Sequence, residues 1–348
     1  MVPRSPSAAP APIEPGPGRP SFRRLSVVIA NHDYERYVGA AIESALAVEW
    51  DDVEVVVVDD GSTDGSVEVI RRYADRVQVL ETENAGQRVA VHRGYTRTTG
   101  DVVVFLDSDD VLPPDLAVRL AEVWGPTVSK AQFRMQRTTA DGAPVGTPFP
   151  AYRRVPTPEQ IRSWAGATTA YPTPPGSGNA YARWFLDRVL PVGPELGRAA
   201  DSAFLAAAPF LGDVVTVPEV VVGYRQHGAN DSDLLRDAER FPREVVRARQ
   251  RWHFAQRVSG GEVDDRPLFR SRELLQLRVA ARRMAPAARP LPGDGFARVL
   301  WDALRAPLHT GPEGPGTRLA VTAWCLATLL TPRAVARRLV ALRYGRRG

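Results

Sequence analysis

The sequence predicts an α/β fold: a mostly parallel sheet flanked by helices, with a mostly helical C-terminal extension. Short, uniformly apolar runs alternate with helical segments, as expected for parallel strands that are buried on both faces. Two of these runs end in clusters of carboxylates, which begin at Asp59 and Asp107. From residue 231 onwards the chain is rich in arginine, and its periodic apolar residues indicate helices.

Strands and helices alternate regularly up to residue 124. Each predicted strand is a run of β-branched or other apolar residues, and each predicted helix follows a polar or glycine-containing turn. Ser62 or Asp64 can cap the second helix, because short polar side chains accept hydrogen bonds from the free N–H groups there. In chain order we expect a strand at 25–30, a helix at 37–46, a strand at 53–58, a helix ending near 73, a strand at 77–80, a helix from 87 to 98, a strand at 101–106 and a helix at 115–124.

The pattern is less regular beyond residue 124. A proline-rich stretch at 144–158 offers no clear element. The remaining predicted elements are a strand at 135–138, a loop at 172–178, a helix at 183–189, a helix at 201–208, a strand at 214–217 and an apolar run at 220–227. The predicted domains are a disordered Pro-rich tail at 1–22, an α/β domain at 23–230 and a helical region at 231–348.

The composition excludes several protein classes. Hydrophobic residues make up 44% and charged residues 24% of the chain, which is typical of a packed globular protein. The net charge is +5 and Lys130 is the only lysine, so the basic excess reflects an arginine-rich composition and does not predict nucleic-acid binding. The single cysteine, Cys325, cannot form an internal disulfide, which suits a reducing cytoplasm. The longest apolar stretch, 319–330, is shorter than the roughly 20 residues of a membrane span.

The two carboxylate clusters are the clearest functional signal. Ionised groups beside a core are unfavourable unless a cation or a hydrogen-bond donor accompanies them. Ligands of open parallel sheets bind beyond the carboxyl ends of the strands, and both clusters follow such ends. The residues alone therefore predict a site for a metal ion and a nucleotide, whereas a solvated acidic turn is the alternative for the second cluster.

Several short blocks follow one another in a fixed order between about residues 26 and 232. They are Asn31-His32-Asp33-Tyr34, Val58-Asp59-Asp60-Gly61-Ser62-Thr63-Asp64, Asn84-Ala85-Gly86-Gln87, Phe105-Leu106-Asp107-Ser108-Asp109-Asp110, Gly178-Asn179-Ala180, the helix at Asp201, and Tyr224-Arg225-Gln226-His227-Gly228-Ala229-Asn230. This series resembles the family 2 glycosyltransferases, which are nucleotide-sugar-dependent enzymes with a GT-A fold. The resemblance implies that 23–230 is a GT-A catalytic domain.

The resemblance also implies a donor-binding set. Asp60 is expected to accept the imide N–H of the nucleobase, His32 to stack on the base, and Asp107 to lie near the donor sugar or ribose. The alternative for Asp60 and Asp64 is that they cap the turn and the following helix. Relatives often carry Ala-Arg-Asn-X-Gly where this chain has residues 90–94 without that arginine. The other expected donor contacts are Ala30, Gln87, Arg88, Ser108 and Asn179.

A divalent cation, Mn or Mg, is the implied cofactor. It is expected to neutralise the diphosphate leaving group, and its implied ligands are Asp109, Asp110 and His227. A histidine in a loop is also often an ordinary hydrogen-bonding residue, so both roles remain open for His227. Arg225 is expected to act as a phosphate contact or a structural partner.

The implied catalytic base is Asp201, which would take the proton of the attacking hydroxyl with inversion at the sugar. Relatives commonly have Glu before this Asp, whereas the present chain has Ala200. Asp201 could instead be only the N-cap of its helix. A non-catalytic nucleotide-sugar-binding or scaffold protein is therefore the runner-up hypothesis. A sugar nucleotidyltransferase fits less well, because the first strand leads into Asn31-His32 and not into a glycine-rich loop.

The predicted reaction is a single sugar addition to a glycan, lipid-linked or small-molecule acceptor. Polymer-forming relatives usually carry Gln-X-X-Arg-Trp, whereas here Gln250-Arg251-Trp252 lacks the two-residue spacer. The expected location is cytoplasmic. The basic segment 333–347 could lie on an anionic membrane at its inner face, or it could pack on the rest of the protein.

Overall fold

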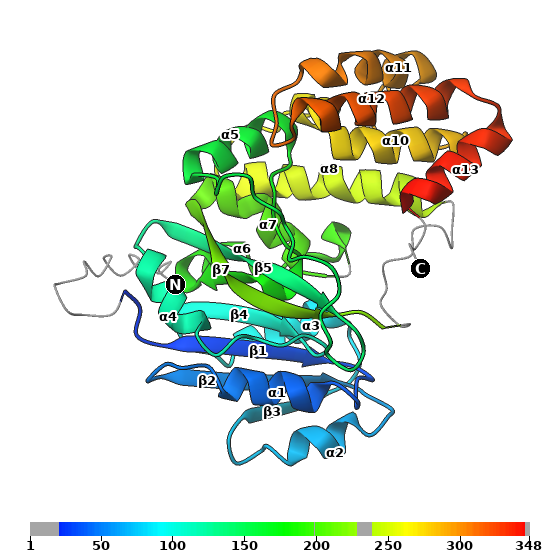
Figure 1. Cartoon of the computed structure of the whole chain (residues 1–348). Helices are drawn as coiled ribbons and strands as arrows, with labels where there is room; N and C mark the ends of the chain where they lie inside the picture. The colour runs from blue at the N-terminus through cyan, green and yellow to red at the C-terminus, as the bar shows by residue number, and fades with distance from the viewer. Residues whose placement is uncertain (1–20, 198, 228–238, 345–348) are drawn as a thin grey trace, which may run out of the picture.

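The computed structural model describes residues 21–197, 199–227 and 239–344 (Figure 1). The predicted disordered tail therefore lies almost entirely outside the described residues, and so does the predicted domain boundary at residue 230. The α/β part and the C-terminal helices are both described.

A single sheet of seven strands has the order β3-β2-β1-β4-β6-β5-β7. β1, β2, β3 and β4 are parallel to one another, β6 is antiparallel to β4 and β5, and β5 is parallel to β7. The predicted fold class, a mostly parallel GT-A-type sheet flanked by helices, is confirmed. The strands are β1 (Leu25–Asn31), β2 (Val53–Asp60), β3 (Gln78–Thr82), β4 (Val102–Asp107), β5 (Val128–Thr138), β6 (Asn179–Ala182) and β7 (Asp213–Arg225).

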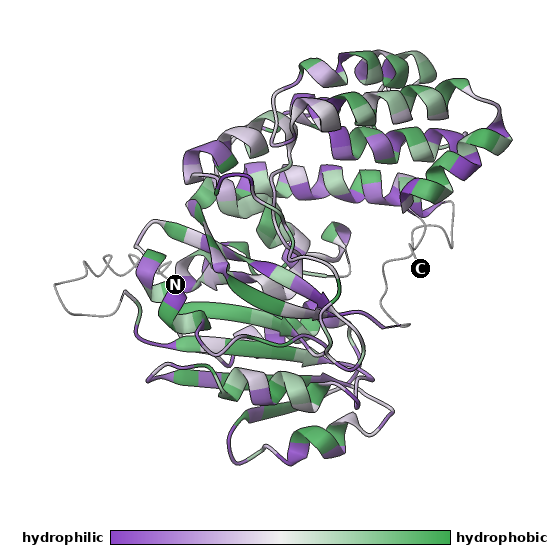
Figure 2. Cartoon of the chain, viewed as in Figure 1, coloured by the Kyte–Doolittle hydropathy of each residue, from purple (hydrophilic) through white to green (hydrophobic). Residues whose placement is uncertain are grey.

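Helices cover both faces of the parallel half of the sheet. Val55 and Val57 of β2 belong to the large core cluster that includes α1, whereas Val56 and Val58 pack with Ala90 of α3. This alternation explains why the strand is apolar at every position, as Figure 2 shows for the central strands. The helices up to the middle of the chain are α1 (Val38–Leu46), α2 (Ser66–Arg71), α3 (Gln87–Tyr95), α4 (Leu116–Val123), α5 (Pro158–Thr168), α6 (Arg183–Val189) and α7 (Asp201–Leu211).

The second half of the sheet differs from the sequence-based expectation. β5 is much longer than the predicted strand at 135–138, because its first residues include Ser129, Lys130 and Gln132, which interrupt the apolar pattern although all three are buried. β6, which directly follows the predicted loop at 172–178, was not predicted as a strand, and β7 joins two predicted segments into one strand. α5 was missed because it lies where the chain is proline-rich.

The C-terminal region is helical, as predicted, for the described residues 239–344. α8 packs against α7 of the α/β part and against α10, so it connects the two parts (Figure 1). Within the bundle the guanidinium of Arg278 is fully buried and bonds to Asp294 and Asp302. The helices are α8 (Arg240–Val258), α9 (Arg266–Arg270), α10 (Arg272–Met284), α11 (Phe296–Arg305), α12 (Pro315–Leu330) and α13 (Arg333–Tyr344).

α13 packs onto the bundle through one face. Ala336 and Val340 are buried, and the ring of Tyr344 lies 5.3 Å from that of Phe241. Leu342 on the same helix is 75% exposed. The packing alternative for this segment is thus seen in the structure, and membrane contact stays a prediction. Among the described residues, no helix combines the length and the apolar character needed to cross a bilayer.

Candidate active site

The strand register brings the two carboxylate clusters to one edge of the sheet. Asn31 of β1 is the partner of Asp59 of β2, and Ala30 is the partner of Asp107 of β4. Asp59 then accepts hydrogen bonds from the Asn31 side chain (3.0 Å) and from the N–H of Ser62 (2.9 Å). This edge, where β1, β2 and β4 end, is called the carboxyl edge below.

Asp60 shapes the turn that precedes α3. Its two carboxylate oxygens accept hydrogen bonds from the backbone N–H groups of Ala85 (2.9 Å) and Gly86 (2.7 Å), and only 3% of the residue is exposed. These contacts are with the turn before α3 and not with the turn and helix that directly follow Asp60, as the alternative proposed, and the predicted contact of Asp60 with a nucleobase remains a prediction. Asp64 likewise accepts from the N–H of Ser66 (2.9 Å) at the start of α2.

Asp107 lies at the centre of the carboxyl edge. One oxygen accepts a hydrogen bond from the side chain of Gln87 (2.8 Å), the first residue of α3. Burial, together with the negative charges of Asp109 and Asp201, raises the pKa of Asp107 to about 7. Three carboxylates therefore repel one another here, which favours a cation or hydrogen-bond donor as an additional partner.

Asp109 and His227 are brought together from positions far apart in the chain. Nε2 of His227 lies 2.9 Å from Oδ2 of Asp109. The imidazole stacks on the ring of Tyr37 at 4.9 Å and meets Tyr34 edge-on at 5.4 Å. Arg225 lies beside this pair and donates to the backbone oxygen of Asp109 (3.0 Å), so it acts as a structural partner in this structure.

Asp110 faces inward, although it was predicted with Asp109 as a metal ligand. Its oxygens accept hydrogen bonds from the hydroxyl of Ser177 (2.6 Å) and from the backbone N–H of Arg225 (3.1 Å). The residue is 1% exposed, and burial raises the pKa of its carboxyl well above the ordinary value. These contacts connect the second cluster to the 174–178 segment and to β7.

Asp201 is the first residue of α7, and the N-cap position belongs to Ala200. The alternative that Asp201 is the N-cap of this helix is therefore wrong. Its carboxylate accepts hydrogen bonds from the backbone N–H groups of Gly176 (3.2 Å) and Ser202 (2.6 Å). Gly176 also lies directly beside Asp107: a Cβ atom added to it would sit 2.6 Å from Oδ2 of Asp107. Gly176 thus joins the predicted base to the second carboxylate cluster.

A buried polar group behind this site was missed by the sequence analysis. Nζ of Lys130 donates to Gln132 (3.0 Å), Thr173 (2.8 Å) and Asn179 (3.0 Å), and the residue has no exposed surface. Burial lowers the pKa of Lys130 well below the ordinary value, and the nearby charge of Asp201 acts against that shift. The available sequence signal was that Lys130 is the only lysine of the chain.

Asn179 belongs to the same buried group. Its amide nitrogen donates to the carbonyl oxygens of Pro174 (3.1 Å) and Gly176 (3.1 Å), and its amide oxygen accepts from Lys130. Asn179 has no exposed surface. Its contacts position the 174–176 segment, so its predicted donor contact is not visible among them.

The remaining predicted donor residues are dispersed along the same region. Ala30 is half-buried in β1, and Ser108 is buried. His32 is exposed, with Nε2 located 3.0 Å from the amide nitrogen of Asn84. Arg88 donates to the backbone oxygen of Val192 (2.6 Å). The geometry thus groups Gln87, Asp107, Asp109, Asp201 and His227 most tightly.

The residues present fit a hard divalent cation. The 2.9 Å between the His227 and Asp109 ligand atoms is short enough for both to bind one ion at the roughly 2.1 Å distances of Mg²⁺. No group of three or more His, Cys, Asp or Glu residues is preformed as a metal site within the described residues. This agrees with ions that are held by one or two protein groups together with substrate phosphates and water.

Comparisons with known proteins address the family. The model of "Glycosyl transferase family 2" matches residues 26–131. An uncharacterized glycosyltransferase of Nostoc sp. is 36% identical over 214 residues, which cover 60% of this chain and 66% of the relative. This chain belongs to glycosyltransferase family 2. The GT-A-type architecture described above is the fold that this family led us to expect.

Other relatives match shorter segments. An uncharacterized glycosyltransferase of Escherichia coli is 36% identical over 28% of this chain and 29% of its own length. An undecaprenyl-phosphate 4-deoxy-4-formamido-L-arabinose transferase of Pectobacterium carotovorum is 35% identical over 29% of this chain and 33% of its own length. The family 2 chain thus spans less than two thirds of each of these relatives.

Two solved structures align with most of this chain. The mannosyltransferase PcManGT of Pyrobaculum calidifontis, in complex with GDP-Man and Mn²⁺, has a TM-score of 0.49 at 21% identity, covering 94% of this chain and 88% of its own. S. aureus TarS 1-349 in complex with UDP has a TM-score of 0.49 at 16% identity, covering 93% of this chain and 92% of its own.

Proposed function

We propose that this family 2 protein is an inverting, metal-dependent glycosyltransferase that adds one sugar at a time. It moves a sugar from a nucleotide-sugar donor to a hydroxyl acceptor in glycan or glycoconjugate biosynthesis. The supporting observation is the convergence of Asp107 with Asp109 and Asp201, with Gly176 between Asp107 and Asp201 and His227 beside Asp109. A relative named as an undecaprenyl-phosphate sugar transferase is consistent with a lipid-linked acceptor.

Asp201 is the proposed general base. The acceptor oxygen attacks the anomeric carbon, the bond from that carbon to the donor phosphate breaks, and the carboxylate of Asp201 takes the hydroxyl proton. Two backbone N–H groups fix the orientation of this carboxylate, which a base for in-line attack requires. A single displacement of this kind inverts the configuration at the anomeric carbon.

Asp109 and His227 would hold the divalent cation. When bound, such an ion supplies positive charge that stabilises the departing diphosphate. The stacking of His227 on Tyr37 fixes the imidazole plane, and the hydrogen bond from Gln87 orients Asp107 toward the ribose or sugar of the donor. We propose that Asp60 acts on the donor mainly by positioning the turn at 84–86, where His32 also lies. We propose that Asp110 supports the loop after β4 through its hydrogen bonds from Ser177 and Arg225.

The decisive experiment measures the release of nucleotide by the purified full chain. UDP-, GDP- and dTDP-sugars are offered with Mn²⁺ or with a chelator, and Asp109→Ala, Asp201→Asn and the exposed control Asp75→Ala are compared. We expect chelation, Asp109→Ala and Asp201→Asn each to lower turnover at least a hundredfold, within the range attributed to general-base and metal catalysis. Asp75→Ala should leave turnover unchanged.

The same experiment tests the scaffold hypothesis. A nucleotide-sugar that raises the melting temperature of the protein, without any turnover in the presence of several acceptors, would favour a binding protein. Turnover that is indifferent to chelator and to Asp109→Ala would contradict the proposed metal site.

The proposed location is cytoplasmic, with peripheral contact at the inner face of the membrane. α13 is the element that supports this proposal, because Val335 and Leu342 are exposed among Arg337, Arg338 and Arg343. An anionic surface attracts such a helix through both its arginines and its exposed apolar side chains. Sedimentation with anionic but not with neutral vesicles, lost on Leu342→Glu, is the expected result.

A further inference from the structure

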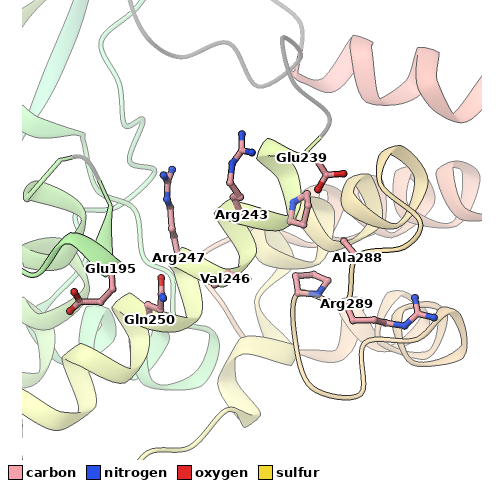
Figure 3. Close-up of a pocket in the computed structure, with 10 residues that line it drawn as sticks. Glu195, Glu239, Arg243, Val246, Arg247, Gln250, Ala288 and Arg289 are labelled. Carbon is pink, nitrogen blue, oxygen red and sulfur yellow. The ribbon is translucent and has the colours of Figure 1, made fainter.

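Lys130 is a fully buried residue whose three hydrogen-bond partners are all neutral. Two of the partners are side-chain amides and the third is a hydroxyl. Other cations of the chain have carboxylate partners: the buried Arg278 bonds to two of them, and Arg247, which Figure 3 shows in a groove along α8, pairs with Glu244 at 2.6 Å. A buried ammonium held only by neutral groups is unfavourable, so a compensating charge further away is expected.

The orientation of the two amides indicates that Lys130 carries three protons. The amide nitrogens of Gln132 and Asn179 donate to backbone carbonyl oxygens at 2.9 and 3.1 Å, so both amide oxygens face Lys130. The hydroxyl of Thr173 donates to a backbone carbonyl oxygen (3.3 Å), so it accepts from Lys130 as well. Three acceptors match the three N–H groups of an ammonium, whereas a neutral amine has only two.

Two amides connect this ammonium to Asp201. Nζ of Lys130 donates to the amide oxygen of Asn179 (3.0 Å), and the amide nitrogen of Asn179 donates to the carbonyl oxygen of Pro175 (3.3 Å). The N–H of the same peptide, on Gly176, donates to the carboxylate of Asp201 (3.2 Å). The two amides thus lie head to tail between a cation and an anion, and hydrogen bonds in such a chain strengthen one another.

The charge of Asp201 is the compensating charge for Lys130. Burial lowers the pKa of Lys130, and the negative charge of Asp201 acts against that shift. Two other charged groups act on Asp201: Asp107 repels it, and Arg251 of α8 attracts it. Arg251 is half-buried, whereas Lys130 has no exposed surface. Because water and salt screen buried charges least, the interaction with Lys130 is the more persistent of the two attractions.

We propose that Lys130 is the counter-charge and a positioning residue of the proposed base: through Asn179 and the 175–176 peptide, its ammonium fixes the carboxylate of Asp201 where the acceptor hydroxyl arrives. The inference rests on the proposed transferase function and assigns a further residue to that site. Lys130 itself touches no substrate, because it is fully buried. In the reaction the hydroxyl proton passes to Asp201, and Lys130 keeps its own protons.

A spectroscopic experiment tests the link between the two charges. Lys130 is the only lysine, so lysine labelled with ¹⁵N at Nζ gives the full chain one side-chain resonance, whose shift distinguishes an ammonium from an amine. We expect an ammonium in the wild type at pH 7. Asp201→Asn should lower the pH at which this resonance changes by about one unit, the low end of the effect of a nearby opposite charge. The exposed control Asp75→Ala should leave it unchanged.

The tyrosines beside Lys130 do not interfere with this titration. The ring of Tyr171 lies 5.0 Å from Nζ, and Tyr181 of β6 is the strand partner of Lys130. Burial raises the pKa of both phenols, so they stay neutral over the range measured. A change in the Lys130 resonance therefore reports its own proton.

A kinetic cycle tests the positioning role. Metal-dependent donor hydrolysis is measured per folded molecule for the wild type, Lys130→Met, Asp201→Asn and the double variant. We expect Lys130→Met to lower kcat about tenfold or more, within the range for misplaced catalytic groups, and to leave the KM for the donor unchanged. In the Asp201→Asn background it should have no further effect, since both changes act through one group. Arg278→Met, which removes another fully buried cation, should leave kcat unchanged.

The outcomes separate this inference from the proposed function. An equal loss of kcat from Lys130→Met in both backgrounds, or a change in KM alone, would indicate a different role and overturn the inference. An amine at pH 7, or the same charge state in the wild type and Asp201→Asn at every pH up to about 10, would overturn it too, even if Lys130→Met does not fold. A wild type that shows the expected resonance but no metal-dependent hydrolysis contradicts the proposed function and leaves the pairing of Lys130 with Asp201 supported.

Discussion

The substitution Gly176→Ala offers a sharp test of the proposed active site, because this glycine touches both sides of it. A Cβ at Gly176 would lie 2.6 Å from Oδ2 of Asp107, whereas ordinary contacts begin at 3.4 Å. The carboxylate or the backbone must therefore move by about 0.8 Å. The N–H of Gly176 also holds Asp201 at 3.2 Å, so a backbone shift displaces the proposed base as well.

A displacement of this size has a large expected effect on turnover. Misplacement of reacting groups by about 1 Å costs on the order of a hundredfold in rate. The backbone at Gly176 has a φ of +26°, and an alanine with positive φ destabilises by about 1–2 kcal/mol. Gly260→Ala is the matched control, since its φ is +73° but its Cβ would meet no atom within 4 Å.

Metal-dependent donor hydrolysis and urea unfolding are measured for both variants. We expect both to lose a similar amount of stability from backbone strain, and only Gly176→Ala to lose about a hundredfold in turnover under conditions where it remains folded. If the two variants turn over at the same rate, Gly176 does not position Asp107 and Asp201 for the reaction.

Three further predictions concern groups outside the site. Arg278→Met leaves the buried carboxylate of Asp294 without its guanidinium and leaves Asp302 with Arg298 alone, so urea unfolding should show a loss of about 3–5 kcal/mol. Burial raises the pKa of Cys325 to about 12, so the thiol should react with a disulfide reagent only after denaturation. Burial lowers the pKa of His92 below 6.5, so the folded state binds fewer protons than the unfolded state. The protein should therefore lose stability as the pH falls through the ordinary histidine range. In His92→Gln the melting temperature should depend less on pH between about pH 7 and 5.5.

The parallel half of the fold could be predicted because its sequence pattern has one cause. β1, β2 and β4 are buried on both faces, so they are apolar at nearly every position and end in polar turns. The same rule failed for β5, where Lys130 and Gln132 satisfy each other inside the protein. α5 was hidden by its proline-rich surroundings, although Pro158 occupies the first helical turn and Thr157 forms a capping box with Gln160.

The sequence predicted which residues form the candidate site, but not which residues they contact. Asp109 and His227 were proposed from the family resemblance, and only the fold brings their atoms to 2.9 Å. Asp110 and Asn179 stand in the same motifs, yet their polar atoms are used within the protein, which no local pattern reveals. The stacking of Tyr37 on His227 requires β7 to end beside the loop after β1, and this long-range contact has no signature in the sequence.

The 174–178 segment contacts carboxylates on both sides of the candidate site. The amide of Gly176 bonds to Asp201, and the hydroxyl of Ser177 bonds to Asp110 while accepting the amide of Asp107. Two adjacent residues thus position both the proposed base and the proposed donor-binding carboxylates. A change in this segment that improves the fit of one substrate also shifts the position of the other, so attempts to alter donor preference here will simultaneously change which acceptors are used.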